Sequence, residues 1–125
     1  MKSGKIMPRK SLQKNEIDQG SIVLIDFSFS NLKGSKYRPA LVISNSSYNK
    51  RFLDVVVLRI TSKPKKEWAI KITNKDVTNG FLEVESYVKV DSIFTIEKAM
   101  IAKVVAQLND EKLGAVKMKL LELFV

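Results

Sequence analysis

Short apolar runs separated by turn residues are the feature that most restricts the fold of this chain. β-Branched and other apolar side chains fill segments 21–29, 37–44 and 53–60. The third run is almost wholly apolar, as expected of a central strand. Segments 67–73 and 86–97 instead alternate apolar and polar residues, which is typical of half-buried strands. The sequence therefore predicts a sheet built from short strands.

The period of the pattern changes after residue 97. Residues 98–108 fit either a further strand or a short helix, whereas residues 109–125 give the clearest helix of the chain. Asn109 can cap that helix, and acids follow it in the first turn, where the helix dipole favours them. Its apolar side chains fall on one stripe at helical spacing: Leu113, Val116, Leu120, Leu121 and Phe124. Strands followed by one amphipathic helix predict a mainly β fold with some α, either an antiparallel sheet or a small barrel covered by the helix.

Two local features refine this prediction. The alternation in segment 86–97 loses its step near Asp91 and Ser92, which predicts a β-bulge there. Arg38 directly precedes Pro39, whose ring disfavours a helical backbone at the preceding residue. Arg38 is therefore expected to be extended at the start of a strand, beside a loop. That position suits a guanidinium that contacts an anion, and it equally suits an arginine that only ends a loop.

Composition excludes several kinds of chemistry. The 125 residues suffice for one domain, and a 45% hydrophobic content allows a real core. The chain has no cysteine and no histidine, so disulfides, thiolate catalysis, histidine zinc sites and histidine acid–base pairs are all impossible. Neither a signal peptide nor a membrane-spanning run is evident, and a cytoplasmic location is expected.

The charge balance is strongly basic. Lysine and arginine number 22 against 13 acids, which gives a net charge of +9. An excess of this size favours a polyanionic partner, either nucleic acid or an acidic protein, although many surface lysines would also explain it. Residues 1–17 are basic with few apolar positions. We interpret them as a loose N-terminal extension, and residues 18–125 as the domain.

Four segments, in order, resemble the MazF/PemK family of toxin ribonucleases from type II toxin–antitoxin systems: GSIVLIDFS, GSKYRPALVIS, VVLRITS and SYVKVDSIFTIEK. The resemblance extends from about residue 18 to the end of the chain. It implies an SH3-like barrel with a C-terminal helix, usually a homodimer. It also implies sequence-specific cleavage of single-stranded RNA without a metal or other cofactor, and neutralisation by a cognate acidic antitoxin.

The same resemblance implies a set of catalytic residues. Arg38 is expected to contact the scissile phosphate, and Thr61 to act beside it. Asp91 matches a proposed general base. Lys89 falls where some members carry an arginine that is proposed as general acid, and lysine lacks the bidentate fork of arginine. Some members place a histidine in the first loop, and this chain has none.

Further residues are implied to bind substrate. Ser62 follows Thr61 at the end of the third strand and is expected to line the same site. Ser86 and Ser92 fall near substrate-binding positions of the family. Lys33 and Lys36, in the first loop, are expected to follow RNA phosphates rather than to act in catalysis, or simply to be solvated.

Each assignment has a structural alternative. Thr61 and Ser62 also suit a turn before a proline, and Asp91 also suits a solvated strand residue or a salt-bridge partner of Lys89 two residues away. Trp68 is expected in the core or at an edge more than as a platform for bases. The rival functions are a non-catalytic barrel that binds RNA and one that poisons a protein target. Related gyrase poisons act through a Trp-Gly-Ile ending, whereas this chain ends LELFV.

Overall fold

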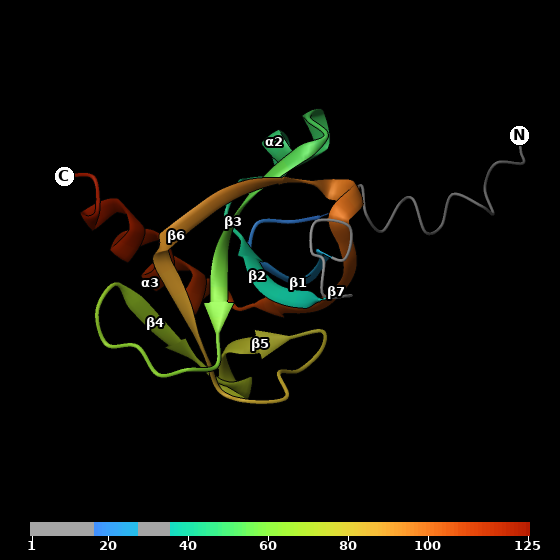
Figure 1. The fold of residues 1–125 in the computed structure, drawn as a ribbon. Helices are drawn as coiled ribbons and strands as arrows, with labels where there is room; N and C mark the ends of the chain where they lie inside the picture. Colours follow the sequence, from blue (N-terminus) through green and yellow to red (C-terminus); the bar gives the residue numbers. More distant parts are fainter. Residues whose placement is uncertain (1–16, 28–35) are drawn as a thin grey trace, which may run out of the picture.

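A curled antiparallel sheet forms the body of the protein (Figure 1). The computed structural model describes residues 17–27 and 36–125. In this part of the chain the strand order is β4-β6-β3-β2-β1-β7-β5. The strands are β1 (Ser21–Asp26), β2 (Tyr37–Val42), β3 (Asp54–Thr61), β4 (Ala69–Ile72), β5 (Val77–Thr78), β6 (Ser86–Glu97) and β7 (Ile101–Leu108). The helices are α2 (Ser46–Arg51) and α3 (Asp110–Glu122), and two 3₁₀ turns are η3 (Asn74–Asp76) and η4 (Lys98–Met100).

These elements confirm the predicted mainly β fold with a C-terminal helix. β3 pairs with β2 on one side and β6 on the other, so it is an interior strand, as its apolar run predicted. The segment from residue 98 to 108 forms η4 and then β7. β5 was not predicted, because its two residues are too few to show an alternating pattern.

The apolar residues form two clusters on opposite faces of the strands. Along β3, Val55 and Val57 belong to one cluster, whereas Leu58 and Ile60 belong to the other. The α3 cluster, so called because Leu113 of α3 packs in it, includes Ile22, Leu41, Leu58, Ile60, Ile72, Val88, Val90, Leu108 and Val116. The second cluster includes Ile17, Val23, Ile25, Val42, Val55, Val57, Ile96 and Ile101. Both faces of the central strands are therefore buried.

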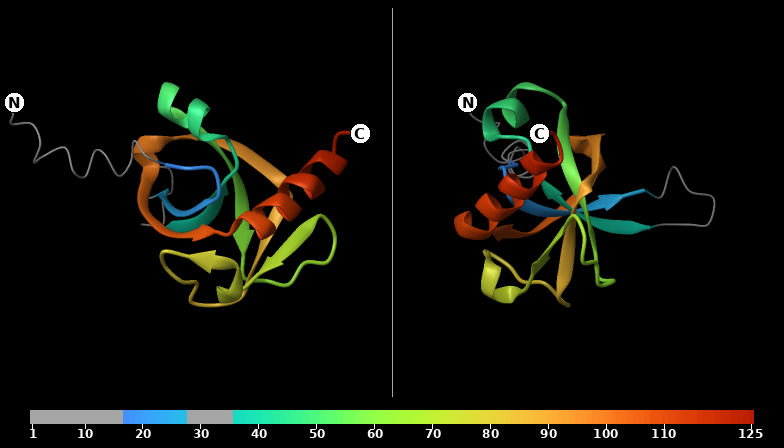
Figure 2. Two further views of the ribbon diagram at one scale, coloured as in Figure 1. Left: turned by 180° about the vertical axis from the view of Figure 1, so that it is seen from behind. Right: turned by 90° about the vertical axis from the view of Figure 1, so that its left-hand side faces the viewer.

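The C-terminal helix begins as predicted and ends differently. The Asn109 side chain accepts a hydrogen bond from the Lys112 backbone amide at 2.8 Å, which confirms the cap. Leu113 and Val116 are buried in the α3 cluster, but Leu121 and Phe124 are 61% and 67% exposed. Figure 2 shows the reason, since the C-terminal end of α3 extends beyond the strands that cover its first turns. The predicted apolar stripe therefore joins the core only along its first part.

The predicted bulge lies in β6. Leu58 of β3 pairs with Ile93, and the next residue, Arg59, pairs with Lys89. The β6 residues between these partners, from 90 to 92, have no partner on β3, which confirms the bulge at Asp91 and Ser92. β6 bends sharply along its length in Figure 1. Its first half contributes to the α3 cluster and its second half to the other cluster.

A buried asparagine fixes the beginning of the described chain. Asn49, on α2, is fully buried and its amide donates hydrogen bonds to the carbonyls of Ile17 at 3.1 Å and Ser44 at 3.0 Å. Ile17 itself is only 1% exposed. The rest of the predicted N-terminal extension, residues 1–16, lies outside the described residues. Among the helices of the described part, none has the length and apolar character that a bilayer span requires.

Candidate functional site

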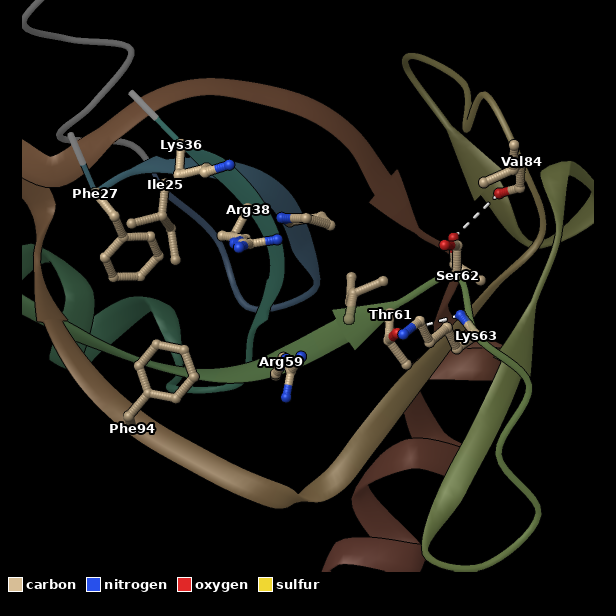
Figure 3. A pocket seen from close by; sticks show the side chains of 13 residues that line it. Ile25, Phe27, Lys36, Arg38, Arg59, Thr61, Ser62, Lys63, Val84 and Phe94 are labelled. Carbon is tan, nitrogen blue, oxygen red and sulfur yellow. Dashed lines mark hydrogen bonds between the residues drawn. The ribbon is translucent and has the colours of Figure 1, made fainter. Parts of the chain in front are cut away.

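A cleft of about 750 Å³ lies where β2 begins and β3 ends (Figure 3). Its polar and charged lining comes from Lys36, Arg38, Arg59, Thr61, Ser62, Lys63 and Ser86. Its apolar lining comes from Ile25, Phe27, Pro39, Ile60, Val84 and Phe94. The predicted residues Arg38, Thr61, Ser62, Lys36 and Ser86 therefore lie in one cleft.

Strand register explains why these side chains meet. Ala40 of β2 pairs with Arg59 of β3. Continuing this antiparallel register by two residues brings Arg38 opposite Thr61, and residues two apart on a strand share a face. Arg38 also pairs with Ile25 of β1. It lies in an extended strand, as expected of the residue before Pro39. Arg38, Arg59 and Thr61 thus project from the same face of adjacent strands.

All charged side chains in the described lining of the cleft are positive. Among the described residues, four cations line it, Lys36, Arg38, Arg59 and Lys63, and no acid does. None of the four forms an ion pair with a carboxylate in the described part of the chain. In Figure 3 the nitrogen ends of Lys36, Arg38 and Arg59 lie in the middle of the view. Phe27 and Phe94 lie to one side of them, and Thr61 and Ser62 to the other. Uncompensated cations grouped in this way are suited to bind phosphate oxygens.

Hydrogen bonds fix two hydroxyl groups of the lining. The Thr61 hydroxyl oxygen accepts a hydrogen bond from the Lys63 backbone amide at 3.1 Å, which is the local turn expected of a threonine in this position. Thr61 is thus both a turn former and a residue of the cleft. Ser86 is buried, and its hydroxyl donates to the Val84 carbonyl at 3.1 Å. Ser62 is exposed at the end of β3.

Three predicted residues do not line the cleft. Lys89 is half-buried on β6, opposite Arg59, and Asp91 and Ser92 lie in the bulge that follows it. Asp91 is exposed and makes no hydrogen bond or ion pair with another described residue, so the alternative of a salt bridge with Lys89 is not present in the structure. Lys33, the remaining predicted residue, lies outside the described residues.

Arg59 and Lys63 are residues of the cleft that sequence reasoning missed. Arg59 lies in a segment that reads as a buried apolar strand. The signal that could have found it is a single cation two residues before Thr61, which places both on one face of the strand. Lys63 is one of several lysines in the loop after β3, and only the structure distinguishes it from the others.

The residues of the cleft are suited to anion binding rather than to metal binding. Among residues 17–27 and 36–125, no group of three or more acidic side chains is placed to hold a metal ion. Arginine offers two parallel donors to phosphate oxygens and is always charged. The hydroxyls of Thr61 and Ser62 add neutral donors in the same cleft.

Comparison with known proteins agrees with this geometry. A family model described as PemK-like, MazF-like toxin of type II toxin–antitoxin systems matches residues 18–124. A solved MazE–MazF structure from Deinococcus radiodurans has a TM-score of 0.71 at 23% identity, and the match covers 86% of this chain and 95% of that one. MazF from the same organism has a TM-score of 0.63 at 25% identity, covering 86% and 94% of the two chains.

A third structure, an endoribonuclease from mycobacterial species, has a TM-score of 0.69 at 18% identity and covers 86% of this chain and 89% of that one. These similarities establish the shared fold, including the curled sheet and its C-terminal helix. No curated protein sequence matches the chain at a significant level.

Proposed function

The chain belongs to the PemK-like, MazF-like toxin family of type II toxin–antitoxin systems, and from this membership we propose that it is an endoribonuclease that cleaves single-stranded RNA. The observation that carries the proposal is the cleft that four cations without a described acidic partner line together with Thr61 and Ser62. A phosphodiester is the ligand whose charge and geometry these donors complement.

We propose cleavage by attack of the 2′-hydroxyl on the adjacent phosphorus. The 2′-oxygen bonds to phosphorus, the bond to the 5′-oxygen breaks, and the products are a 2′,3′-cyclic phosphate and a 5′-hydroxyl. The 2′-hydroxyl proton passes to a base, and the departing 5′-oxygen takes a proton from water. Arg38 and the Thr61 hydroxyl would stabilise the negative charge that develops on the phosphoryl oxygens, which is commonly the largest contribution to such catalysis.

Asp91 remains our proposal for the base, on the strength of the resemblance of its segment to the family. The described lining of the cleft contains no carboxylate, whereas the bulge brings Asp91 next to the point where Leu58 is followed by Arg59 in register. A catalytic hydrogen bond is often long before substrate binds, so a base need not lie in the cleft of the free protein. Charge stabilisation by Arg38 would carry more of the rate than proton transfer.

The test is incubation of the purified protein with a long single-stranded RNA in EDTA, followed by mapping of the cut ends. We expect cleavage at a short recurring sequence, undiminished by the chelator, with cyclic phosphate at the new 3′ ends. An Arg38→Ala preparation, purified in parallel, controls for contaminating ribonuclease. Activity that requires added magnesium would contradict the metal-independent mechanism. RNA that binds but stays intact would instead favour a non-catalytic RNA-binding barrel.

We also propose the biological setting that the family implies. The partner would be a cognate acidic antitoxin, because a net charge of +9 and an uncompensated basic cleft complement acidic side chains. A structure of MazE bound to MazF is known from Deinococcus radiodurans. We propose a homodimer located in the cytoplasm. Exposed apolar side chains on α3, namely Met118 and Leu121, would be available for contact with a second copy.

A further inference from the structure

Arg59 and Lys89 lie directly opposite each other on the antiparallel strands β3 and β6. Side chains that are opposite in such a pair project from the same face and approach closely, and like charges in these positions destabilise a sheet. Neither cation forms an ion pair with a carboxylate in residues 17–27 and 36–125. The register therefore places two cations side by side on one face of the sheet, and no described acid is paired with either.

The cross-strand neighbours of this pair are small and uncharged. On one side of the pair, Ala40 of β2 is the register partner of Arg59. On the other side, Ala69 of β4 is the register partner of Lys89. The row across four strands thus reads alanine, arginine, lysine, alanine. The alanine methyl groups on the two sides are too small to shield the cations, and they carry no charge that could pair with them. Asp91, the acid closest in sequence, lies in the bulge and pairs with neither cation.

The pair is continuous with the cleft already described. Arg59 lines that cleft together with Arg38, and the strand register places Arg59 two residues along β3 from Thr61, on the same face. A second anionic group could therefore bind at Arg59 and Lys89 while a first binds at Arg38 and Thr61. Successive phosphates of one RNA strand supply such a series of anions.

We propose that Arg59 and Lys89 form a second phosphate site, which binds a phosphate of the RNA next to the scissile one. The inference rests on the proposed function. Arg59 would supply paired donors to the phosphate oxygens and Lys89 a point charge. It also gives Lys89 a role in holding the RNA rather than in donating a proton to the leaving oxygen.

The experiment measures binding without cleavage as a function of salt. Once the cut position is mapped, an RNA oligonucleotide with a 2′-deoxynucleotide at that position binds but lacks the attacking hydroxyl. Its dissociation constant is measured from low to high salt for the wild type, Arg59→Gln, Lys89→Gln and the double variant. Lys50→Gln is the matched control, since Lys50 is exposed on α2 and does not line the cleft. Thermal melts establish that each variant folds.

We expect either single substitution to weaken binding roughly tenfold, the lower end for a charged hydrogen bond. The slope of log affinity against log salt should fall by about 0.7, the value for one phosphate contact on a single strand. Because both cations serve one phosphate, the double variant should lose less than the sum of the two single losses. Arg59→Lys should retain the wild-type slope, because the charge is kept.

Two further measurements separate this site from its alternatives. At saturating RNA, Lys89→Gln should keep kcat within about twofold while KM rises, since binding rather than chemistry is lost. A fall in kcat at unchanged KM and unchanged salt slope would identify Lys89 as the proton donor and overturn the proposal. Unchanged RNA binding combined with weaker binding of polyglutamate would assign the pair to an acidic protein partner and overturn it as well.

The two proposals fail in distinguishable ways. A wild-type protein that neither binds nor cuts RNA overturns the proposed function, and this inference with it. A wild-type protein that cuts RNA, while Arg59→Gln and Lys89→Gln behave like Lys50→Gln, overturns the second phosphate site alone. If a neutral methylphosphonate replaces the phosphate next to the cut, the wild type and Arg59→Gln should bind the RNA equally well, because that position no longer carries a negative charge for Arg59 to contact.

Discussion

The ammonium group of Lys119 lies 5.0 Å from the centre of the Trp68 ring, and this contact joins α3 to the loop before β4. Trp68 has a positive φ of 55°, which is uncommon for a bulky side chain and costs conformational energy. Its carbonyl also accepts a hydrogen bond from the Val90 amide at 3.0 Å, beside the β6 bulge. The packing of the ring against α3 therefore helps to hold a strained connection next to the proposed RNA site.

Lys119→Met tests this contact. We expect a loss of about 0.5–1 kcal/mol in the free energy of unfolding, the usual size of a partly exposed cation–π interaction. Trp68 is the only tryptophan in the chain, so its fluorescence reports both unfolding and the local environment of the ring. Lys119 also forms an ion pair with Glu122 at 3.3 Å, so Glu122→Gln, which removes that ion pair alone, is the control. Equal stability of the two variants would show that the Lys119 contact contributes nothing measurable.

Arg38→Ala should abolish most of the cleavage. Removing one charged donor from a developing oxyanion costs roughly 2.7–4 kcal/mol, or about 100- to 1000-fold in rate. RNA binding should weaken more modestly, because Arg38 also contacts the ground-state phosphate in our proposal. The measurement pairs cleavage rate with affinity for the 2′-deoxy oligonucleotide. Arg51→Ala, an exposed arginine on α2 outside the cleft, should cleave like the wild type.

Asp91→Asn should separate chemistry from binding. If Asp91 accepts the 2′-hydroxyl proton, cleavage falls by roughly 100-fold or more, the usual size of general-base catalysis. RNA binding should hold or improve, since a negative charge near the phosphates is removed. Glu67→Gln, which removes one exposed negative charge from the loop after β3, is the control for net charge. Wild-type cleavage by Asp91→Asn would show that Asp91 is not the base.

Asn49→Ala should destabilise the fold without touching the cleft. The buried amide donates to the Ile17 and Ser44 carbonyls and its oxygen accepts from the Ser44 hydroxyl. Leaving those groups unpaired in the interior costs about 1–3 kcal/mol for each unsatisfied group. Urea unfolding measures the loss, and Ser47→Ala, exposed on the same helix, should change stability far less.

Two glycines should respond oppositely to the same substitution. A Cβ on Gly80 would collide with the backbone carbonyl of Val105 in β7, and Gly80 has a φ of +149°. Gly80→Ala should therefore lower stability by more than about 1 kcal/mol. Gly114 lies within α3, and a Cβ there would meet no atom within 4 Å. Gly114→Ala should raise stability by about 0.5–1 kcal/mol. Thermal melts of both variants check the opposite signs, and a gain in stability for Gly80→Ala would contradict the close approach of Gly80 to the Val105 carbonyl of β7.

Local pattern predicted most of the fold because most strands bury one or both faces. The bulge at Asp91 could be predicted from a break in the alternation of apolar and polar residues. The cap could be predicted because Asn109 directly precedes a segment with apolar residues at helical spacing. β5 escaped prediction, because two residues carry no period. The exposure of Leu121 could not be predicted either, since it depends on where the sheet ends beneath α3 rather than on the helix itself.

The candidate site could likewise be predicted only in part from the sequence. Arg38 and Thr61 could be predicted, because the sequence around each resembles the family, and the structure places both in the cleft. Arg59 could not, because its significance comes from register, a relationship between strands distant in the sequence. Ala40 and Lys89 become its neighbours only once β2, β3 and β6 are paired.

The outermost strands of the sheet are its shortest, four residues in β4 and two in β5. β4 also carries Lys71, whose ammonium group pairs with Glu85 at 3.3 Å. Such edges in the described chain give an incoming strand few backbone groups to pair with, and a lysine on the edge discourages pairing further. A partner protein would therefore gain little by extending the sheet with a strand of its own. Its affinity would have to come from side chains, which makes recognition sensitive to salt and to single charge reversals rather than to the backbone conformation of the partner.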